Sequence, residues 1–144
     1  MKKAAQGFTL VEMLIVLAII GIIAAIAVPQ YSDYVTRSKL TEAFATLSDH
    51  RVKMEQYFQD NRSYVGACAA GTIAPLPTGR YFTYACSNLT ATTFTVTATG
   101  VAAQGTNGFV YTINQANSRT TTTVATGWNG AGSSCWVTNK AGGC

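Results

Sequence analysis

The side chains with the greatest chemical potential are few, and the first of them is an acid in an apolar stretch. From Phe8 to Val28 only Thr9 and Glu12 are polar. An ionised acid at the centre of a bilayer costs about 2.5–3.5 kcal/mol, so a retained acid calls for a partner. If the chain is cut after Gly7, the new α-amine of Phe8 lies four residues before Glu12. In a packed assembly, the amine of one copy could neutralise Glu12 of the next. The alternative is an acid tolerated near the lipid headgroups.

The four cysteines are the second group, and they indicate disulfide bonds. Cys68, Cys86, Cys135 and Cys144 form no CxxC motif, and the single histidine, His50, is not near them in the sequence. A zinc site is therefore not expected. An even number of cysteines beyond a membrane segment favours two disulfides in an oxidising compartment. Of the three possible pairings we favour Cys68–Cys86, which ties a loop to a strand, and Cys135–Cys144, which closes the tail.

Charge is segregated along the chain. All six acids lie in the first 60 residues, and the charged residues beyond position 60 are all basic: Arg62, Arg80, Arg119 and Lys140. A region without carboxylates offers neither a calcium site nor a carboxylate pair for acid–base catalysis. No Ser/His/Asp or Cys/His set is expected outside the helix, because His50 is the only histidine in the sequence, and we assign it to the polar face of the helix. We therefore predict no enzyme activity, no metal and no cofactor.

The stretch from Phe8 to Val28 is long enough to cross a membrane. Its 21 residues would span roughly 31 Å as a helix. The run is too long for the apolar region of a secretory signal peptide. Lys2 and Lys3 precede it and no charge follows it as far as Gln30, which predicts an N-terminus inside and a C-terminus outside.

The segment GFTLVEMLIVLAIIGIIAAIAVPQY, Gly7 to Tyr31, resembles the N-terminal signature of type IV pilins and related pseudopilins. The resemblance implies cleavage between Gly7 and Phe8 by a prepilin peptidase, N-methylation of Phe8, and a role for Phe8 and Glu12 in subunit docking. It implies a single-pass inner-membrane precursor with its head in the periplasm. Inner-membrane assembly machinery would then pack it with other pilin subunits into an extracellular fibre.

The rest of the chain divides into segments that would support such a fibre. We expect a leader over 1–7, a membrane and polymerisation helix over 8–30, an amphipathic helix over 31–60 and a head over 61–144. Gly21 and Pro29 are expected to bend or locally break the helix before it resumes. An apolar stripe then recurs at helical spacing: Leu40, Phe44, Leu47, Met54 and Phe58.

The head carries the pattern of a half-buried antiparallel sheet. Four segments have strand character: Arg80–Cys86, Thr92–Thr99, Gly108–Asn114 and Ser118–Thr126. Val96 and Ala98 alternate with threonines, so one face of the sheet needs a cover, which the helix stripe can provide. We predict an α+β fold, the type IV pilin fold, in which one long helix packs on about four strands beside a disulfide-closed C-terminal loop.

The predicted function is a structural subunit of a type IV pilus for adhesion, twitching motility or DNA uptake. Two stretches, Arg51–Tyr64 and Tyr84–Gly100, resemble minor pilins of the pilus-assembly group. The first alternative is a DNA-binding minor pilin for natural transformation. Its phosphate contacts would come from the four basic residues beyond position 60, and its stacking platforms from Tyr64, Tyr81 and Trp136, with Trp136 and Lys140 facing solvent on the C-terminal loop.

The second alternative is a type II secretion pseudopilin. The family resemblance implies that the commonest such subunit carries an acidic calcium site and no disulfides, which is the opposite of the pattern in this chain.

Overall fold

The computed structural model describes residues 8–144, which divide into two compact units, 8–35 and 36–144. One helix, α1 (Leu10–Asn61), contributes to both units. It is the helix expected from the sequence, and it continues through Gly21 and Pro29 without interruption. A proline inside a helix removes one backbone donor. The chain nevertheless stays helical on both sides of Pro29, so the expected local break is absent.

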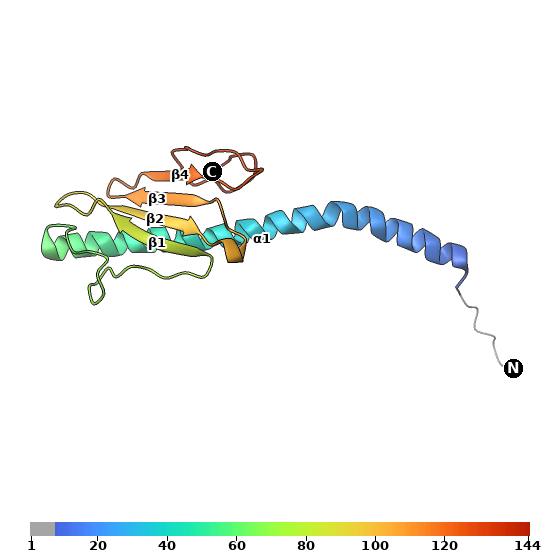
Figure 1. The fold of residues 1–144 in the computed structure, drawn as a ribbon, viewed down its shortest axis with the longest axis horizontal. Helices are drawn as coiled ribbons and strands as arrows, with labels where there is room; N and C mark the ends of the chain where they lie inside the picture. Colours follow the sequence, from blue (N-terminus) through green and yellow to red (C-terminus); the bar gives the residue numbers. More distant parts are fainter. Residues whose placement is uncertain (1–7) are drawn as a thin grey trace. The chain divides into compact units, whose positions relative to one another are not determined.

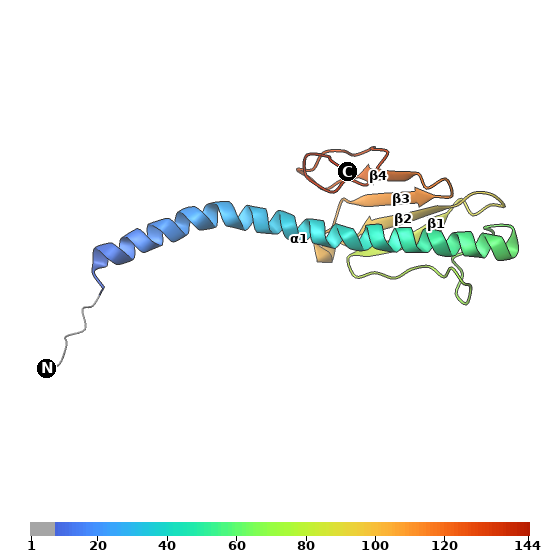
Figure 2. The same cartoon turned by 180° about the vertical axis from the view of Figure 1, so that it is seen from behind.

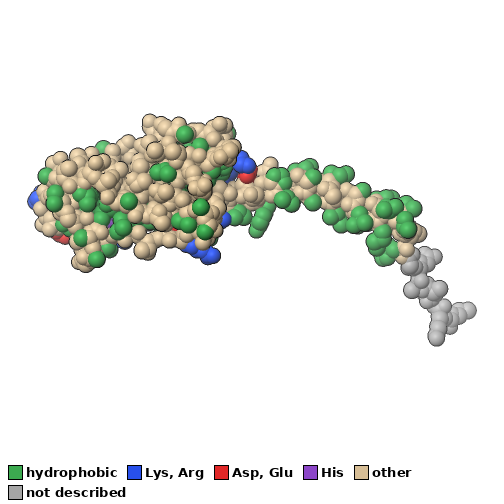
Figure 3. All heavy atoms as spheres, viewed as in Figure 1, with side chains coloured by type: hydrophobic (Ala, Val, Ile, Leu, Met, Phe, Trp, Pro, Cys, Tyr) green, Lys and Arg blue, Asp and Glu red, His purple; other side chains and the backbone are tan. Residues whose placement is uncertain are grey.

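The N-terminal part of α1 has no apolar partner within the chain. Every residue from 8 to 32 is exposed, and the green apolar side chains of this segment lie bare in Figure 3. Within the described residues, α1 is the one helix long and apolar enough to cross a membrane. A bare apolar surface of this kind needs either lipid or other protein helices around it.

The C-terminal part of α1 is amphipathic and packs on the head. Its buried residues are Leu40, Ala43, Leu47, His50 and Met54. The predicted stripe is confirmed at the three large aliphatic positions, while Phe44 and Phe58 are only partly buried. The helix ends at Asn61, where Arg62 adopts a left-handed conformation with φ of 54° and donates its backbone N–H to the carbonyl of Phe58.

Four strands form an antiparallel sheet in the order β1-β2-β3-β4, as Figure 1 shows. They are β1 (Phe82–Ser87), β2 (Thr95–Gly100), β3 (Val110–Asn114) and β4 (Arg119–Thr123), and a short 3-10 helix, η1 (Ala102–Gln104), links β2 to β3. Tyr84 lies opposite Ala98, and Ala98 lies opposite Tyr111.

Each predicted strand overlaps an observed one, but the second begins three residues later than expected. The hydroxyl of Thr90 accepts the backbone N–H groups of Thr92 and Thr93, and this turn delays the strand to Thr95.

One face of the sheet covers the C-terminal part of α1, and the views in Figures 1 and 2 agree on this arrangement. The core between them contains mainly aromatic and aliphatic side chains. The fully buried members from the sheet side are Phe82, Phe94, Val96, Ala98, Phe109, Tyr111 and Ile113. The predicted α+β architecture, one long helix on a four-stranded antiparallel sheet, is confirmed.

Two disulfides complete the head. Cys68 is bonded to Cys86 and Cys135 to Cys144, the pairing favoured from the sequence. The first joins the loop after α1 to β1, and the second closes the C-terminal loop. Loops of this size gain about 2–3 kcal/mol from each bond in the chain-entropy account.

Candidate functional site

The N-terminal end of α1 presents the acid that the sequence singled out. Glu12 Oε2 accepts hydrogen bonds from the backbone N–H and the hydroxyl of Thr9, at 2.7 and 2.9 Å. Thr9 Oγ1 in turn accepts the N–H of Glu12. This reciprocal arrangement is a capping box, which satisfies donors at the helix start. Phe8 precedes it with 81% of its surface exposed. Gly7, and with it the predicted cleavage junction, lies outside the described residues.

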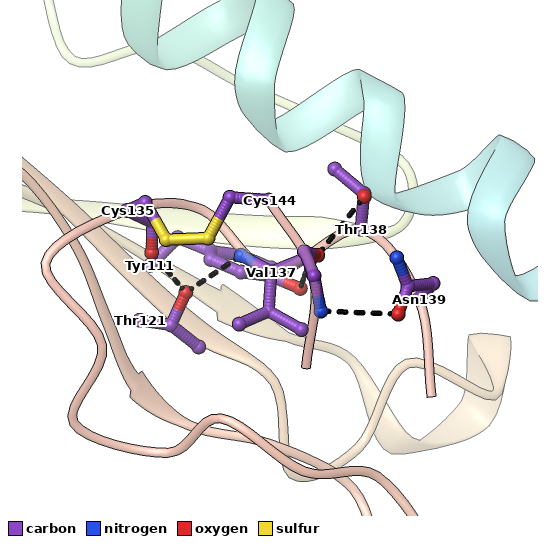
Figure 4. The surroundings of a disulfide bond; sticks show 8 residues. Tyr111, Thr121, Cys135, Val137, Thr138, Asn139 and Cys144 are labelled. Atoms are coloured by element: carbon purple, nitrogen blue, oxygen red, sulfur yellow. Dashed lines mark hydrogen bonds between the residues drawn. A yellow bond between two sulfur atoms is a disulfide. The ribbon is translucent and has the colours of Figure 1, made fainter. Parts of the chain in front are cut away.

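The C-terminal loop is built around the Cys135–Cys144 bond, as Figure 4 shows. Thr121 of β4 anchors its start, because the Thr121 hydroxyl donates to the carbonyl of Cys135 and accepts the N–H of Val137. The Tyr111 hydroxyl donates to the carbonyl of Val137 at 3.0 Å. The tail folds on itself, with Asn139 Oδ1 accepting the N–H of Gly143. The loop is therefore tied firmly to the sheet at one end and closed by its own bonds at the other.

Trp136 is buried, which corrects the expectation that it faces solvent. Only 6% of its surface is exposed. Its ring stacks on Phe44 of α1, with centroids 5.3 Å apart and planes 7° apart, and its indole N–H donates to the carbonyl of Thr112. The guanidinium of Arg119 lies 4.7 Å from the ring centroid. Packing against α1 thus covers the Trp136 ring, which the sequence analysis had proposed as a platform for stacking DNA bases.

A groove runs beside this cluster, between α1 and the C-terminal loop. It has a volume of about 450 Å³ and is lined by Phe44, Ser48, Arg119, Trp136 and Cys144 among others. Arg119 is the one charged side chain in its lining. The groove therefore combines apolar walls with a single positive charge.

The four basic residues of the head are exposed but do not form one site. Arg80 precedes β1 and lies with Lys39 over the ring of Tyr81, at 5.5 and 5.6 Å from its centroid. Arg62 follows the other end of the packed helix. The backbone N–H of Arg80 contacts Glu42 and that of Arg62 contacts Phe58. Sixteen helical residues, about 24 Å, separate these two contacts.

The other residues predicted to contact DNA differ in their exposure to solvent. Lys140 is exposed on the C-terminal loop, as expected. Tyr64 is only 4% exposed, because it packs against Phe58 and Phe94 and its hydroxyl donates to Glu55. Burial and the nearby Glu55 carboxylate raise the pKa of Tyr64 above its usual value. Of the three aromatic residues proposed for stacking, only Tyr81 remains partly accessible.

Acids of α1 reach into the head that lacks acids of its own. Glu42 accepts the N–H groups of three consecutive residues, Arg80, Tyr81 and Phe82, at 2.9 to 3.2 Å. A side chain at Gly79 would collide with the Glu42 carboxylate, 2.6 Å from the position of its Cβ. Sequence reasoning missed this anchor, since nothing local links position 42 to position 80.

His50 is the second correction, because it is buried rather than on the polar face of α1. Its exposed fraction is 1%, and its Nε2 lies 3.4 Å from Cys68 Sγ and 3.7 Å from Cys86 Sγ. Burial, with a smaller contribution from Lys53, lowers the pKa of His50 below its ordinary value. The histidine that appeared remote from the cysteines in the sequence is their immediate neighbour in the fold.

Two family profiles match the sequence. Residues 29–108 match the family described as "Type IV minor pilin ComP, DNA uptake sequence receptor", which covers more than half of the chain. Residues 2–28 match the prokaryotic N-terminal methylation motif.

Curated relatives are fimbrial proteins. The chain is 39% identical over 110 residues to fimbrial protein EcpC of Eikenella corrodens, covering 76% of this chain and 63% of that protein. It is 37% identical over 82 residues to the type IV major fimbrial protein FimA of Dichelobacter nodosus, covering 56% and 51%. The alignments thus span about half to two thirds of each relative's length.

Among solved structures, the crystal structure of the Neisseria meningitidis non-core minor pilin PilV has the same fold. The TM-score is 0.54 at 19% identity, covering 64% of this chain and 91% of that one. At this level of identity the likeness bears on the fold alone.

Proposed function

This chain belongs to the type IV pilin family, in the group described as the minor pilin ComP, and on that premise we propose that it is a structural subunit of an extracellular type IV pilus. The observation that carries the proposal is the bare apolar surface of residues 8–32, headed by Glu12. A lipid anchor needs such a surface but gains nothing from the acid. A bundle of identical helices buries the surface, and it also gives the acid a counter-charge if Glu12 pairs with the α-amine of another copy.

The proposed sequence of events begins in the inner membrane, with the head in the periplasm. A prepilin peptidase cuts between Gly7 and Phe8, and Phe8 is N-methylated. The α-amine of Phe8 in one subunit then pairs with Glu12 of its neighbour while the pilus machinery packs residues 8–30 into the fibre. The match of residues 2–28 to the methylation motif supports the processing steps.

Mass analysis of filaments sheared from the cell surface tests this function. We expect a chain that begins at methylated Phe8 and carries four oxidised cysteines, since both disulfides are formed in the folded head. Cells whose prepilin peptidase is inactivated serve as the control and should yield no such filament protein. Recovery of the protein only from membranes, with residues 1–7 still attached, would contradict the proposal.

A second candidate function is DNA binding by a minor pilin, favoured by the family description and by the groove beside Arg119. Residues 36–144 carry eight lysines and arginines against four acids. Phosphate contacts by such a surface make binding depend steeply on salt. The burial of Tyr64 and Trp136 shifts the expected contacts from base stacking to phosphate, with Tyr81 as the remaining platform.

Fluorescence anisotropy with a labelled DNA duplex tests this candidate on the detergent-solubilised chain. We expect R119Q to weaken binding about fivefold to tenfold and to reduce the salt slope by about one, the value for one lost phosphate contact. R62Q, an equal charge change at another place on the head, is the matched control and should have a smaller effect. Binding that is insensitive to salt between 50 and 200 mM, or equal losses in the two variants, would count against a site at this groove.

A further inference from the structure

A second cluster of chemically active side chains lies away from the groove and from the N-terminal helix. His50 of α1, Cys68 of the following loop and Cys86 of β1 bring one nitrogen and two sulfurs within 4.8 Å of one another. Met54, one helical turn after His50, places its Sδ 3.8 Å from Cys68 Sγ. The cluster is enclosed, with His50 and Met54 fully buried and both cysteines partly so. Neither the pilus assembly nor the DNA contact proposed above uses it.

The distances from the imidazole nitrogen to the two sulfurs match the nitrogen–sulfur edges of a tetrahedral zinc site, whereas the two sulfurs are bonded to each other. Zinc bonds of about 2.3 Å to sulfur and about 2.1 Å to imidazole nitrogen set a nitrogen–sulfur edge of about 3.6 Å and a sulfur–sulfur edge of about 3.8 Å. The observed distances from His50 Nε2 to the two sulfurs are 3.4 and 3.7 Å. The imidazole is thus already placed where a ligand to a shared ion would stand.

One change is needed before the sulfurs can act as ligands. In the oxidised head they are bonded to each other, and a disulfide provides no thiolate. The Cα atoms of Cys68 and Cys86 are 6.5 Å apart, near the wide end of the range for disulfides. In the proposed zinc-bound state, side-chain rotations after reduction would part the sulfurs to about 3.8 Å, the edge of the tetrahedron. Two thiolates and a divalent ion are neutral together, which suits an enclosed site.

We propose that the reduced head binds one zinc ion through His50 Nε2, Cys68 Sγ and Cys86 Sγ, and that zinc binding and the Cys68–Cys86 disulfide are alternative states of the same site. Reduction by a trialkylphosphine breaks the sulfur–sulfur bond, delivers two electrons to the cysteines and leaves the phosphine as its oxide, with oxygen and protons from water. Zinc then replaces the two thiol protons, which pass to the solvent. The newly translocated chain, whose thiols have not yet been oxidised, reaches the zinc-binding state without a reductant.

The site predicts a difference between the two disulfides that serves as an internal control. Zinc bound to the Cys68 and Cys86 thiolates should slow their oxidation. Cys135 and Cys144 of the C-terminal loop lie elsewhere, beside Arg119 and Trp136, and zinc at the first site should not affect their oxidation. Oxidised glutathione added to the reduced, detergent-solubilised chain, followed by mass mapping of each bond over time, measures this difference. We expect zinc to slow formation of the Cys68–Cys86 bond at least tenfold and to leave the Cys135–Cys144 bond within twofold.

Zinc affinity provides the second measurement. The full chain reduced with a phosphine is titrated against a chromophoric zinc chelator, and one ion per chain is expected. H50Q should weaken binding at least tenfold, because it removes one ligand and leaves both thiols. The double variant C135S/C144S is the matched control and should bind like the parent. Equal zinc affinity of H50Q and the parent would overturn the proposal, because it is the result expected of an unfolded chain that binds zinc through thiols alone. Equal slowing of the formation of both disulfides by zinc would also overturn it.

Discussion

A chain carrying E12Q is expected to stay in the membrane and to form almost no surface filaments. Within a bundle of the apolar segment, the α-amine of Phe8 has Glu12 as its proposed counter-charge. Removing one member of a buried ion pair costs about 3–5 kcal/mol, since the other charge is left unpaired. Each 1.4 kcal/mol is a factor of ten in affinity, so subunit packing should weaken by more than a hundredfold. Quantitative immunoblots of sheared filaments and of membranes measure the effect.

The control for E12Q separates charge pairing from helix capping. Glu12 also accepts two hydrogen bonds from Thr9, so its loss could act through the helix start alone. T9V removes the hydroxyl from this capping box and keeps the Glu12 charge. Filament yield from T9V should remain within about twofold of the parent, because a lost cap costs only about 1 kcal/mol and the apolar bundle holds the helix. Equal losses in T9V and E12Q, or normal filaments in E12Q, would contradict a pairing role.

W136A should destabilise the head by about 3–5 kcal/mol, the usual cost of deleting a large buried aromatic side chain. Trp136 is stacked on Phe44, donates to the carbonyl of Thr112 and lies under Arg119. Its loss opens a cavity between α1 and the C-terminal loop and leaves the Thr112 carbonyl without that donor. Near-ultraviolet circular dichroism during denaturant unfolding reports on head packing, whereas the apolar part of α1 would dominate a far-ultraviolet signal.

W128A is the matched control, because Trp128 is partly exposed and contacts Phe109 through an edge-to-face pair at 4.8 Å. It should cost less than half as much as W136A. R119Q removes only the cation above the Trp136 ring and should cost about 0.5–1 kcal/mol. If W136A unfolds at the same denaturant concentration as W128A, the indole does not hold the C-terminal loop on the helix.

Local patterns in the sequence were sufficient to predict the architecture. Alternation of Val96 and Ala98 with Thr95 and Thr97 revealed a sheet with one buried face, and that face meets α1. Helical spacing likewise located the buried face of α1 at Leu40, Leu47 and Met54. Such periodicities are set by the backbone geometry of each element, so they can be read without knowledge of the partner.

The errors concern residues whose surroundings are set by distant parts of the chain. His50 was assigned to the polar face by its residue type, but at roughly 100° per residue it lies only about 40° around the helix from the buried Met54. A disulfide between the following loop and β1 covers it. Trp136 was placed in solvent because it belongs to a loop, yet Phe44 lies 92 positions earlier and receives its ring. Neither partner is visible from neighbouring residues.

The basic residues show the same limit. Absence of acids beyond position 60 suggested that the four basic residues of this region could contact phosphate together. The fold instead brings Glu42 and Glu55 of α1 against the head and separates Arg62 from Arg80. Charge along a sequence therefore predicted the sign of the surface but not the grouping of its charges.

The Glu42 carboxylate has a mechanical consequence. The carboxylate accepts hydrogen bonds from the N–H groups of Arg80, Tyr81 and Phe82 where β1 begins. The Cys68–Cys86 disulfide bonds the other end of the same strand to the loop after α1. A tension applied along α1 is therefore shared with β1 at two points rather than borne by side-chain packing alone. Under load, the sheet would resist separation from the helix because β1 is held near both of its ends.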